Sequence, residues 1–325
     1  MKTYATLGPA CMDQETLCDM LRAGLTGFRL NLSHTALAEC EDWLHAVSAA
    51  AGQTGTHPEL IIDMRGGELR TGKLARPITL QEGDTVTFGR DGLPLDDDIL
   101  AALTVGQDIL VDDDTIRLTV ASRDGQSAAC RCTRGGVLGS QKGITLPGIT
   151  LERPAVSPED HADFALAGTY GITGIMQPFV RSRRDLVEVR QAMAQHGIAD
   201  LMLFAKVEDE TGLKNLPDWM ALCDVVTIAR GDLGSNLPLW TLPRVQKEIA
   251  AICRQSHKSF LVVTQLLASM VSHPVPTRAE VSDIYNACLD GADALMLTNE
   301  TAQGRYPAQS VEWLLRVARE GEAHR

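Results

Sequence analysis

The sequence predicts an α/β protein, a (β/α)₈ TIM barrel with a small all-β domain inserted after the third strand. Three observations predict it. Eight short aliphatic runs are spread along the 325 residues, and most of them are separated by helical patterns. Eight strand–helix units are what such a barrel requires. The runs also end in charged or polar residues, and between the third and fourth runs the hydrophobic period shortens to two.

The barrel strands are predicted from continuous apolar runs, because a strand of a parallel barrel is buried on both faces. The helices between them begin at capping signals. Asp13 opens the first helix, Ser157 stands before a proline and two acidic residues, and Ser282 opens a later helix. The predicted strands cover residues 4–7, 27–31, 60–63, 174–179, 201–207, 225–229, 260–264 and 294–298.

Residues 73–142 follow a different pattern, in which apolar and polar residues alternate. Alternation is typical of strands with one buried face, and Gly-Asp and Asp-Gly pairs mark the tight turns between them. A domain inserted at a carboxyl-end loop of a barrel commonly forms a lid over the site. We therefore predict residues 1–72 as the first part of the barrel, 73–142 as the lid domain, and 143–325 as the rest of the barrel.

The composition restricts the class of partner. A formal net charge of −12 argues against a nucleic-acid or anionic-membrane surface, because either would need a basic face. The eight cysteines are scattered without a CxxC pair, which favours reduced cytosolic thiols over a metal finger. The N-terminal residues have no long apolar core, and no run approaches the length that spans a bilayer. We expect a soluble, cytoplasmic protein.

Charged residues end two neighbouring predicted strands, and parallel strands present their carboxyl ends at one rim of a barrel. Glu208 and Asp232 follow the fifth and sixth runs. Such carboxylates suit Mg²⁺, which takes oxygen ligands and keeps part of its shell for substrate and water. Lys206 beside that metal and Arg29 across the barrel would both face an anion, such as a phosphoryl group in transfer.

Three further side chains suit a different ion. Asn31, Ser33 and Asp63 lie at or just after the second and third runs, and would suit a weakly held monovalent cation better than a transition metal. Taken one at a time, the charges at the rim could equally be solvated ion pairs at strand ends, and Arg230 could simply bridge carboxylates. Their joint occurrence at the ends of eight strands favours a site.

Several motifs occur in order along nearly the whole chain. Ala-Arg-Gly-Asp-Leu-Gly at residues 229–234, followed by Pro-Thr-Arg-Ala-Glu at residues 276–280, is a highly specific combination. These motifs resemble the pyruvate kinase family. The resemblance also covers residues 6–10, 29–34, 63–72, 138–148, 206–208, 264–265 and 289–293.

The resemblance implies phosphoryl transfer from phosphoenolpyruvate to ADP, which gives pyruvate and ATP and depends on Mg²⁺ and K⁺. Lys206 would stabilise the transferring phosphoryl group, and Arg29 would bind the phosphate of phosphoenolpyruvate. The backbone of Gly231 and Asp232, with Thr264, would hold the carboxylate. Thr264 would also lie near the route by which the enolate is protonated.

The resemblance further implies which residues hold the ions and the nucleotide. Glu208 and Asp232 would hold Mg²⁺. The K⁺ site would consist of Asn31, Ser33, Asp63 and the Met64 carbonyl. The nucleotide would contact the segment Asn31 to His34, together with Arg70 and with Lys142 at the edge of the lid.

The chain also departs from the family pattern. It ends just past the barrel, so we expect the C-terminal regulatory domain that is usual in pyruvate kinases, and its allosteric control, to be missing. A family lysine is Arg65 here, a rigid proline is Gly67, and the glycine that usually follows His34 is Thr35. These changes lie on the floor and the nucleotide side of the site, and none removes a metal ligand or the central lysine.

The departures keep two alternatives open. A diverged enzyme could use the same lysine and Mg²⁺ for enolate chemistry on a pyruvate-like 2-oxo acid, namely C–C cleavage or formation, decarboxylation or protonation. A non-catalytic paralogue is less favoured, because a dead site has no need of buried charges that cost desolvation. Whichever function holds, we expect a homodimer or homotetramer that assembles through barrel faces.

Overall fold

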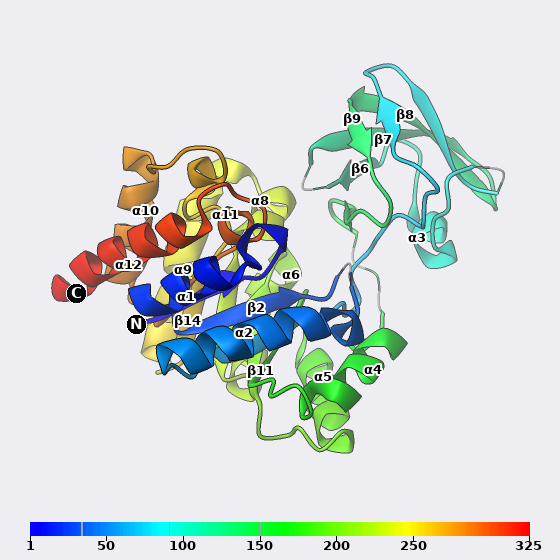
Figure 1. Ribbon diagram of the computed structural model, residues 1–325. Helices are drawn as coiled ribbons and strands as arrows, with labels where there is room; N and C mark the ends of the chain where they lie inside the picture. The colour runs from blue at the N-terminus through cyan, green and yellow to red at the C-terminus, as the bar shows by residue number, and fades with distance from the viewer. Residues whose placement is uncertain (34, 91, 113, 150, 152) are drawn as a thin grey trace. The chain divides into compact units, whose positions relative to one another are not determined.

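The computed structural model describes residues 1–33, 35–90, 92–112, 114–149, 151 and 153–325 (Figure 1). The chain forms two compact units. The predicted α/β class and the (β/α)₈ barrel are confirmed in the first unit. The first unit consists of Met1–Gly66, Ala155–Leu233 and Trp240–Arg325, and the second of Gly67–Pro154 with Gly234–Leu239.

Eight parallel strands close the barrel in the order β1-β15-β14-β13-β12-β11-β3-β2. The ring closes where β1 pairs with both β15 and β2. Every predicted strand is present, with bounds within two residues of those predicted. The strands are β1 (Lys2–Thr6), β2 (Gly27–Asn31), β3 (Glu59–Asp63), β11 (Gly174–Gln177), β12 (Met202–Val207), β13 (Val225–Ala229), β14 (Ser259–Val263) and β15 (Ala294–Leu297).

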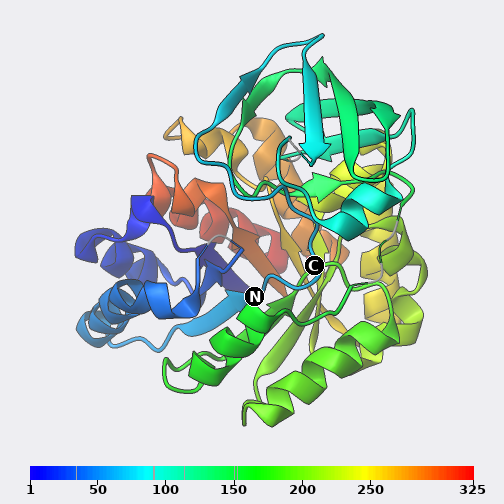
Figure 2. The ribbon, with the colours of Figure 1, turned by 90° about the vertical axis from the view of Figure 1, so that its right-hand side faces the viewer.

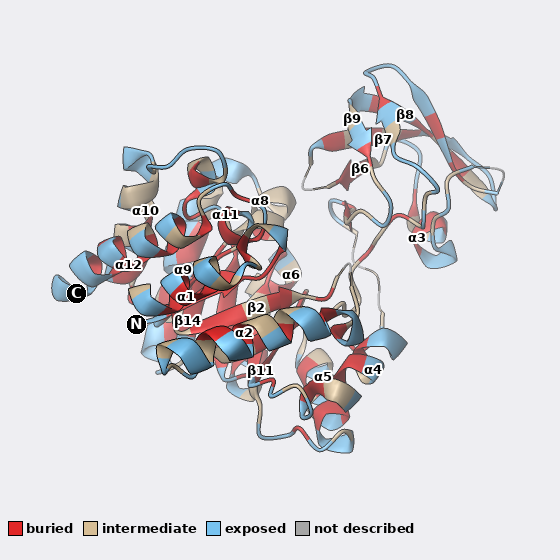
Figure 3. Ribbon diagram, viewed as in Figure 1, coloured by how far each residue is buried: buried red, intermediate tan, exposed pale blue. Residues whose placement is uncertain are grey.

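Alternate residues of the strands fill the inside of the barrel with an apolar layer. Tyr4, Ile61, Phe204 and Leu261 belong to this layer and are buried. The rings of Tyr4 and Phe204 meet edge to face with their centroids 6.1 Å apart, an arrangement that aromatic pairs favour. Figure 3 shows the barrel strands as mostly buried. The barrel is therefore a packed core that supports a site at its rim.

Helices lie around the strands of the barrel (Figures 1 and 2). Within the described residues, every helix is too short or too polar to cross a bilayer. The α-helices outside residues 67–154 are α1 (Gln14–Ala23), α2 (Glu41–Thr54), α4 (Pro158–Ala167), α5 (Arg183–Gln195), α6 (Glu210–Lys214), α7 (Leu216–Trp219), α8 (Arg230–Asn236), α9 (Leu242–Gln255), α10 (Arg278–Asp290), α11 (Asn299–Ala302) and α12 (Pro307–Ala323).

The helix starts follow capping chemistry. Asp13 caps α1 and Ser157 caps α4, as predicted. The start predicted at Ser282 is wrong, because α10 already begins at the residue after Thr277. Glu280 N donates to Thr277 Oγ1 at 3.3 Å, and Glu280 Oε2 accepts from Thr277 N at 2.7 Å. This reciprocal pair is a capping box, which satisfies two amides that a helix start leaves free.

The second unit is built of antiparallel strands and has a core of its own, in which Phe88, Ile99 and Leu118 are fully buried. One sheet has the order β10-β6-β7-β8-β5, and β4 pairs with β9. The short helix α3 (Asp97–Ala102) was not predicted. The strands are β4 (Ile78–Leu80), β5 (Thr85–Gly89), β6 (Asp108–Val111), β7 (Ile116–Arg123), β8 (Ser127–Arg134), β9 (Gly136–Leu138) and β10 (Ile144–Thr145).

Candidate active site

Predicted site residues lie at the carboxyl-terminal ends of barrel strands, where barrel enzymes hold their active sites. Arg29 lies on β2, and Asp63 is the last residue of β3. Lys206 is near the end of β12, and Glu208 follows that strand directly. Thr264 directly follows β14. Four strands that are far apart in the sequence thus supply side chains to one rim.

An ionic cluster lies at the centre of this rim. Lys206 Nζ is 3.2 Å from Asp63 Oδ2 and 3.0 Å from Glu208 Oε1. Arg29 contacts the same Asp63 oxygen through Nη2 at 2.5 Å and through Nε at 3.0 Å. Two cations therefore share one carboxylate oxygen, and Lys206 joins two carboxylates. Such a cluster provides a fixed positive field for an anionic ligand.

The charges of this cluster support one another. Burial by itself would raise the pKa of the Asp63 carboxyl, but the nearby Lys206 and Arg29 charges outweigh it and hold that pKa below its usual value. Burial would lower the pKa of the Lys206 ammonium, but Asp63 and Glu208 outweigh that effect and raise the pKa above its usual value. Asp63 is therefore ionised and Lys206 protonated at neutral pH.

The second oxygen of Asp63 has no hydrogen-bond partner among the described residues. Asp63 is 2% exposed, and within the described part of the chain its Oδ1 has no hydrogen-bond donor. Asn31 ends the neighbouring strand in register with Asp63, and Ser33 N donates to Asn31 Oδ1 at 3.2 Å. Met64 follows and is buried. A buried anionic oxygen without a donor is costly, so this position fits a cation.

The predicted Mg²⁺ ligands lie close to Lys206. Glu208 is 1% exposed, and its Oε2 accepts a hydrogen bond from Phe179 N at 2.6 Å. Asp232 lies in the first turn of α8. Burial lowers the pKa of Lys206, Asp63 and Glu208 raise it, and the charge of Asp232 raises it by a smaller amount. Among the described residues, no group of three or more His, Cys, Asp and Glu side chains is arranged around one point. A pair of carboxylates fits Mg²⁺, which keeps several waters and substrate oxygens.

Thr264 has an unusual backbone. Its φ is 80°, in the left-handed region that a β-branched residue rarely adopts. Arg230 donates to Thr264 O through Nη2 at 2.8 Å and Nε at 3.2 Å. Arg230 also pairs with Asp283 Oδ2 at 2.7 Å. A Cβ on Gly231 would lie 3.0 Å from Thr264 Cγ2. Arg230 thus holds a strained Thr264 close to Gly231, where an added side chain would be tightly packed.

A family model describing the pyruvate kinase barrel domain matches residues 1–311 of the chain. The chain belongs to the pyruvate kinase family. The family membership predicted from the motifs is therefore confirmed, and the rim described above occupies the part of the chain that the family model covers.

Several pyruvate kinases are similar to this chain. The pyruvate kinase of Aeropyrum pernix is 35% identical over 321 residues, which cover 98% of this chain and 70% of that protein. That of Agrobacterium vitis is 35% identical over 334 residues, covering 100% and 68%. That of Thermococcus litoralis is 33% identical over 333 residues, covering 100% and 70%. The similarity therefore extends over the whole of this chain.

The residues predicted to contact the nucleotide in this family member lie in separate parts of the chain. His34 lies outside the described residues. Arg70 and Lys142 belong to the second unit. Arg70 Nη1 donates to the carbonyl of Gln141 at 2.7 Å, and Lys142 Nζ pairs with Asp112 Oδ1 at 2.9 Å. The structure thus brings Arg70 close to the backbone next to Lys142.

Two contacts of the rim were not predicted. Arg29 Nη1 donates to Thr6 Oγ1 at 3.1 Å. Thr6 opens the family motif of residues 6–10, so that motif could have indicated it. Phe179, whose amide binds Glu208, has a φ of 48°. No sequence signal predicts this, because a phenylalanine does not favour the left-handed region.

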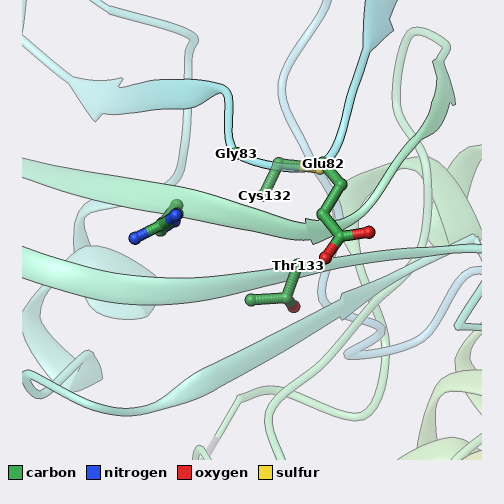
Figure 4. Close-up of a pocket in the computed structure, with 5 residues that line it drawn as sticks. Glu82, Gly83, Cys132 and Thr133 are labelled. Carbon is green, nitrogen blue, oxygen red and sulfur yellow. The ribbon is translucent and has the colours of Figure 1, made fainter.

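Two cavities in the described part of the chain lie away from the charged rim. A cavity of about 480 Å³ lies at the amino-terminal ends of barrel strands, with Tyr4 and Phe204 in its lining. Neither cavity is lined by a predicted site residue, since those residues lie at the carboxyl-terminal ends of the barrel strands or belong to other parts of the second unit. A shallow cavity of about 610 Å³ in the second unit (Figure 4) is lined by Glu82, Gly83, Arg131, Cys132 and Thr133.

Proposed function

We propose that the protein transfers the phosphoryl group of phosphoenolpyruvate to ADP, giving pyruvate and ATP. The observation that supports this most is the pairing of Lys206 with Asp63 and Glu208 at the rim of a pyruvate kinase family barrel. A buried ammonium held between carboxylates suits phosphoryl transfer, because charge is spread over the oxygens of the transferring group in its transition state.

The proposed reaction depends on two ions. Glu208 and Asp232 would hold Mg²⁺, which supplies charge neutralisation at phosphoryl and enolate oxygens when bound. Asp63 Oδ1, which has no partner within the described residues, supports a K⁺ site beside Arg29. The K⁺ ligands would be Asn31, Ser33, Asp63 and the carbonyl of Met64.

The side chains of the rim would divide the remaining work. Arg29 would bind the phosphate of phosphoenolpyruvate, and the backbone of Gly231 and Asp232 with Thr264 would hold its carboxylate. Lys206 would stabilise the phosphoryl group through its charge and not as a base, because its raised pKa keeps it protonated. Thr264 would lie near the route by which a proton reaches the enolate.

We propose that residues 73–142, inserted between residues 1–72 and 143–325, act as a lid. We also propose a cytoplasmic location. We further propose a homodimer or homotetramer formed through barrel faces, and light scattering of the purified protein would measure this oligomeric state. The residues that would contact ADP are Asn31, His34, Arg70 and Lys142.

The test is a coupled assay for pyruvate formed from phosphoenolpyruvate and ADP. Lys206→Met should lower kcat by about 10²–10³-fold, as expected when one electrostatic donor to a transition state is lost. Lys258→Met is the matched control, because Lys258 lies just before β14, at the amino-terminal end of the barrel, and among the described residues its Nζ donates to the Cys223 carbonyl alone. Wild-type turnover no better than that of Lys206→Met would contradict the proposal.

The division of the predicted site residues between the two units supports a second candidate function. Lys206, Glu208 and Thr264 belong to the first unit, whereas Arg70 and Lys142 belong to the second. The first unit could therefore serve an enolate of a pyruvate-like 2-oxo acid without a nucleotide. Mg²⁺-dependent exchange of the methyl protons of pyruvate in D₂O, unchanged by ADP and without ATP formation, would favour this candidate over the kinase.

A further inference from the structure

We propose that Arg65, Asp160 and Asp163 position the ligands of the monovalent-cation site without touching the cation. The inference rests on the K⁺ site of the proposed function and names the residues that shape it. All three belong to the first unit. Asp160 and Asp163 lie on α4 and are 0% and 2% exposed, although no step of the proposed reaction uses them.

Asp160 holds the peptide that contains a proposed K⁺ ligand. Its Oδ1 accepts a hydrogen bond from Arg65 N at 2.8 Å, and its Oδ2 accepts from Gly66 N at 3.0 Å. Arg65 N and the Met64 carbonyl belong to the same planar peptide group. Fixing the N–H on Asp160 therefore fixes the Met64 carbonyl in the opposite direction. Met64 N is held as well, because it donates to Met176 O at 3.0 Å.

Arg65 and Asp163 hold the segment on the other side of the same site. Arg65 Nη2 donates to Thr35 O at 2.6 Å, and Arg65 Nη1 pairs with Asp163 Oδ2 at 2.8 Å. The other oxygen of Asp163 accepts from Leu37 N at 2.8 Å. The chain that leaves β2 through Ser33, a proposed K⁺ ligand, is thus tied to α4 at two points.

These contacts are more specific than a stabilising ion pair. They end on the Arg65 amide, which shares a peptide group with the Met64 carbonyl, and on the backbone at residues 35 and 37, so they fix both segments that would supply the cation with oxygens. The side chains of Arg65 and Asp163 are 21% and 3% exposed, so solvent screens their pairing little. Mutation of partners that orient ligands in this way typically lowers metal affinity by about 10–100-fold.

The guanidinium of Arg65 has a geometric role that a lysine fills only in part. Its separate nitrogens reach Thr35 O and Asp163 in one plane. A lysine ammonium is a compact charge and cannot provide the same fork. The conservative variant Arg65→Lys should therefore keep part of the effect, and Arg65→Met should lose it.

The experiment measures K⁺ binding without turnover. The melting temperature is followed while KCl replaces tetramethylammonium chloride at constant ionic strength, since a ligand that binds the folded state stabilises it by mass action. Hydrogen exchange of residues 35–37 is measured on the same samples. Arg65→Met should raise the apparent K⁺ dissociation constant about 10-fold or more and speed exchange of these amides. Arg65→Lys should lie between Arg65→Met and wild type.

The matched control is Arg190→Met. Arg190 likewise pairs with a carboxylate, Asp224 Oδ2 at 2.8 Å, and donates to a carbonyl, Leu222 O at 3.2 Å. Both partners precede β13, at the amino-terminal end of the barrel. The control should lower the baseline melting temperature while it keeps the wild-type response to K⁺. If Arg65→Met does not fold, Asp163→Asn takes its place, because it keeps an acceptor for Leu37 N.

The outcomes separate this inference from the proposed function. The positioning role alone would be overturned if Arg65→Met matched wild type both in the rise of its melting temperature with K⁺ and in the hydrogen exchange of residues 35–37. A wild-type protein without any K⁺-specific stabilisation would overturn the cation site itself, and the positioning role with it. A loss of K⁺ response in Arg190→Met as large as in Arg65→Met would reduce the effect to general destabilisation and overturn the inference.

Discussion

Lys206 Nζ lies 3.2 Å from Asp63 Oδ2, although β11 separates their strands β12 and β3 in the barrel. Arg29 binds the same oxygen. The Lys206 and Arg29 side chains are 12% exposed and that of Asp63 is 3% exposed. Each charge in such a buried group depends on the others, because removing one leaves an uncompensated charge away from water.

Asp63→Asn removes the carboxylate that Lys206 and Arg29 share. We expect the free energy of unfolding to fall by about 3–5 kcal/mol, because two cations then face each other without their common anion. Urea denaturation measures the change. Glu248→Gln is the control, since it breaks an exposed pair with Arg244 and should cost less than about 1 kcal/mol. Equal losses in the two variants would refute the shared role of Asp63.

The raised pKa of Lys206 predicts how stability depends on pH. Burial lowers that pKa, but Asp63 and Glu208 raise it by more, so the folded pKa exceeds the unfolded value of about 10.4. The stabilisation from Lys206 is then complete below the unfolded pKa and is lost as pH rises through the folded pKa. The difference in unfolding free energy between wild type and Lys206→Met should stay constant from about pH 7 to about pH 10. A difference that shrinks already between about pH 7 and about pH 9 would show that the ammonium loses its proton there.

Arg230→Met should release the carbonyl of Thr264 and its left-handed backbone. We expect kcat to fall by about 10²-fold, because a displacement of about 1 Å at a positioned group is sufficient for such a loss. The coupled pyruvate assay measures it. The control is Arg244→Met, which removes an arginine whose side chain is 70% exposed and pairs with Glu248 on the same helix. Unchanged kcat in Arg230→Met would show that Thr264 is held by other contacts.

Gly231→Ala tests the close approach between α8 and Thr264. The added Cβ would lie 3.0 Å from Thr264 Cγ2, so the Thr264 side chain must shift by a few tenths of an ångström. We expect a higher KM for phosphoenolpyruvate, about 10-fold or more, with little change in stability. Gly52→Ala is the control, because a Cβ at Gly52 meets no atom within 4 Å and lies inside α2. The control should leave KM unchanged and stabilise the helix by up to about 1 kcal/mol.

Local sequence patterns were sufficient to predict the barrel strands and the helix starts at Asp13 and Ser157. Continuous apolar runs predict buried parallel strands because both faces of such strands are covered. The wrong start at Ser282 has a local cause as well. Ser282 has the residue type of an N-cap, but Thr277 and Glu280 form a complete capping box earlier in the chain, and a helix already formed passes through Ser282.

The sequence by itself determined the family, the strand ends and the residue types at the rim, because these depend on motifs and on the period of burial. Only the tertiary structure decided that Lys206 and Arg29 share one oxygen of Asp63, while the other oxygen has no partner among the described residues. Lys206 and Asp63 are 143 positions apart, and only closure of the barrel brings them together. The left-handed backbone of Thr264 and the ties from Arg65 to α4 also come from tertiary contacts, since no local preference of the chain produces them.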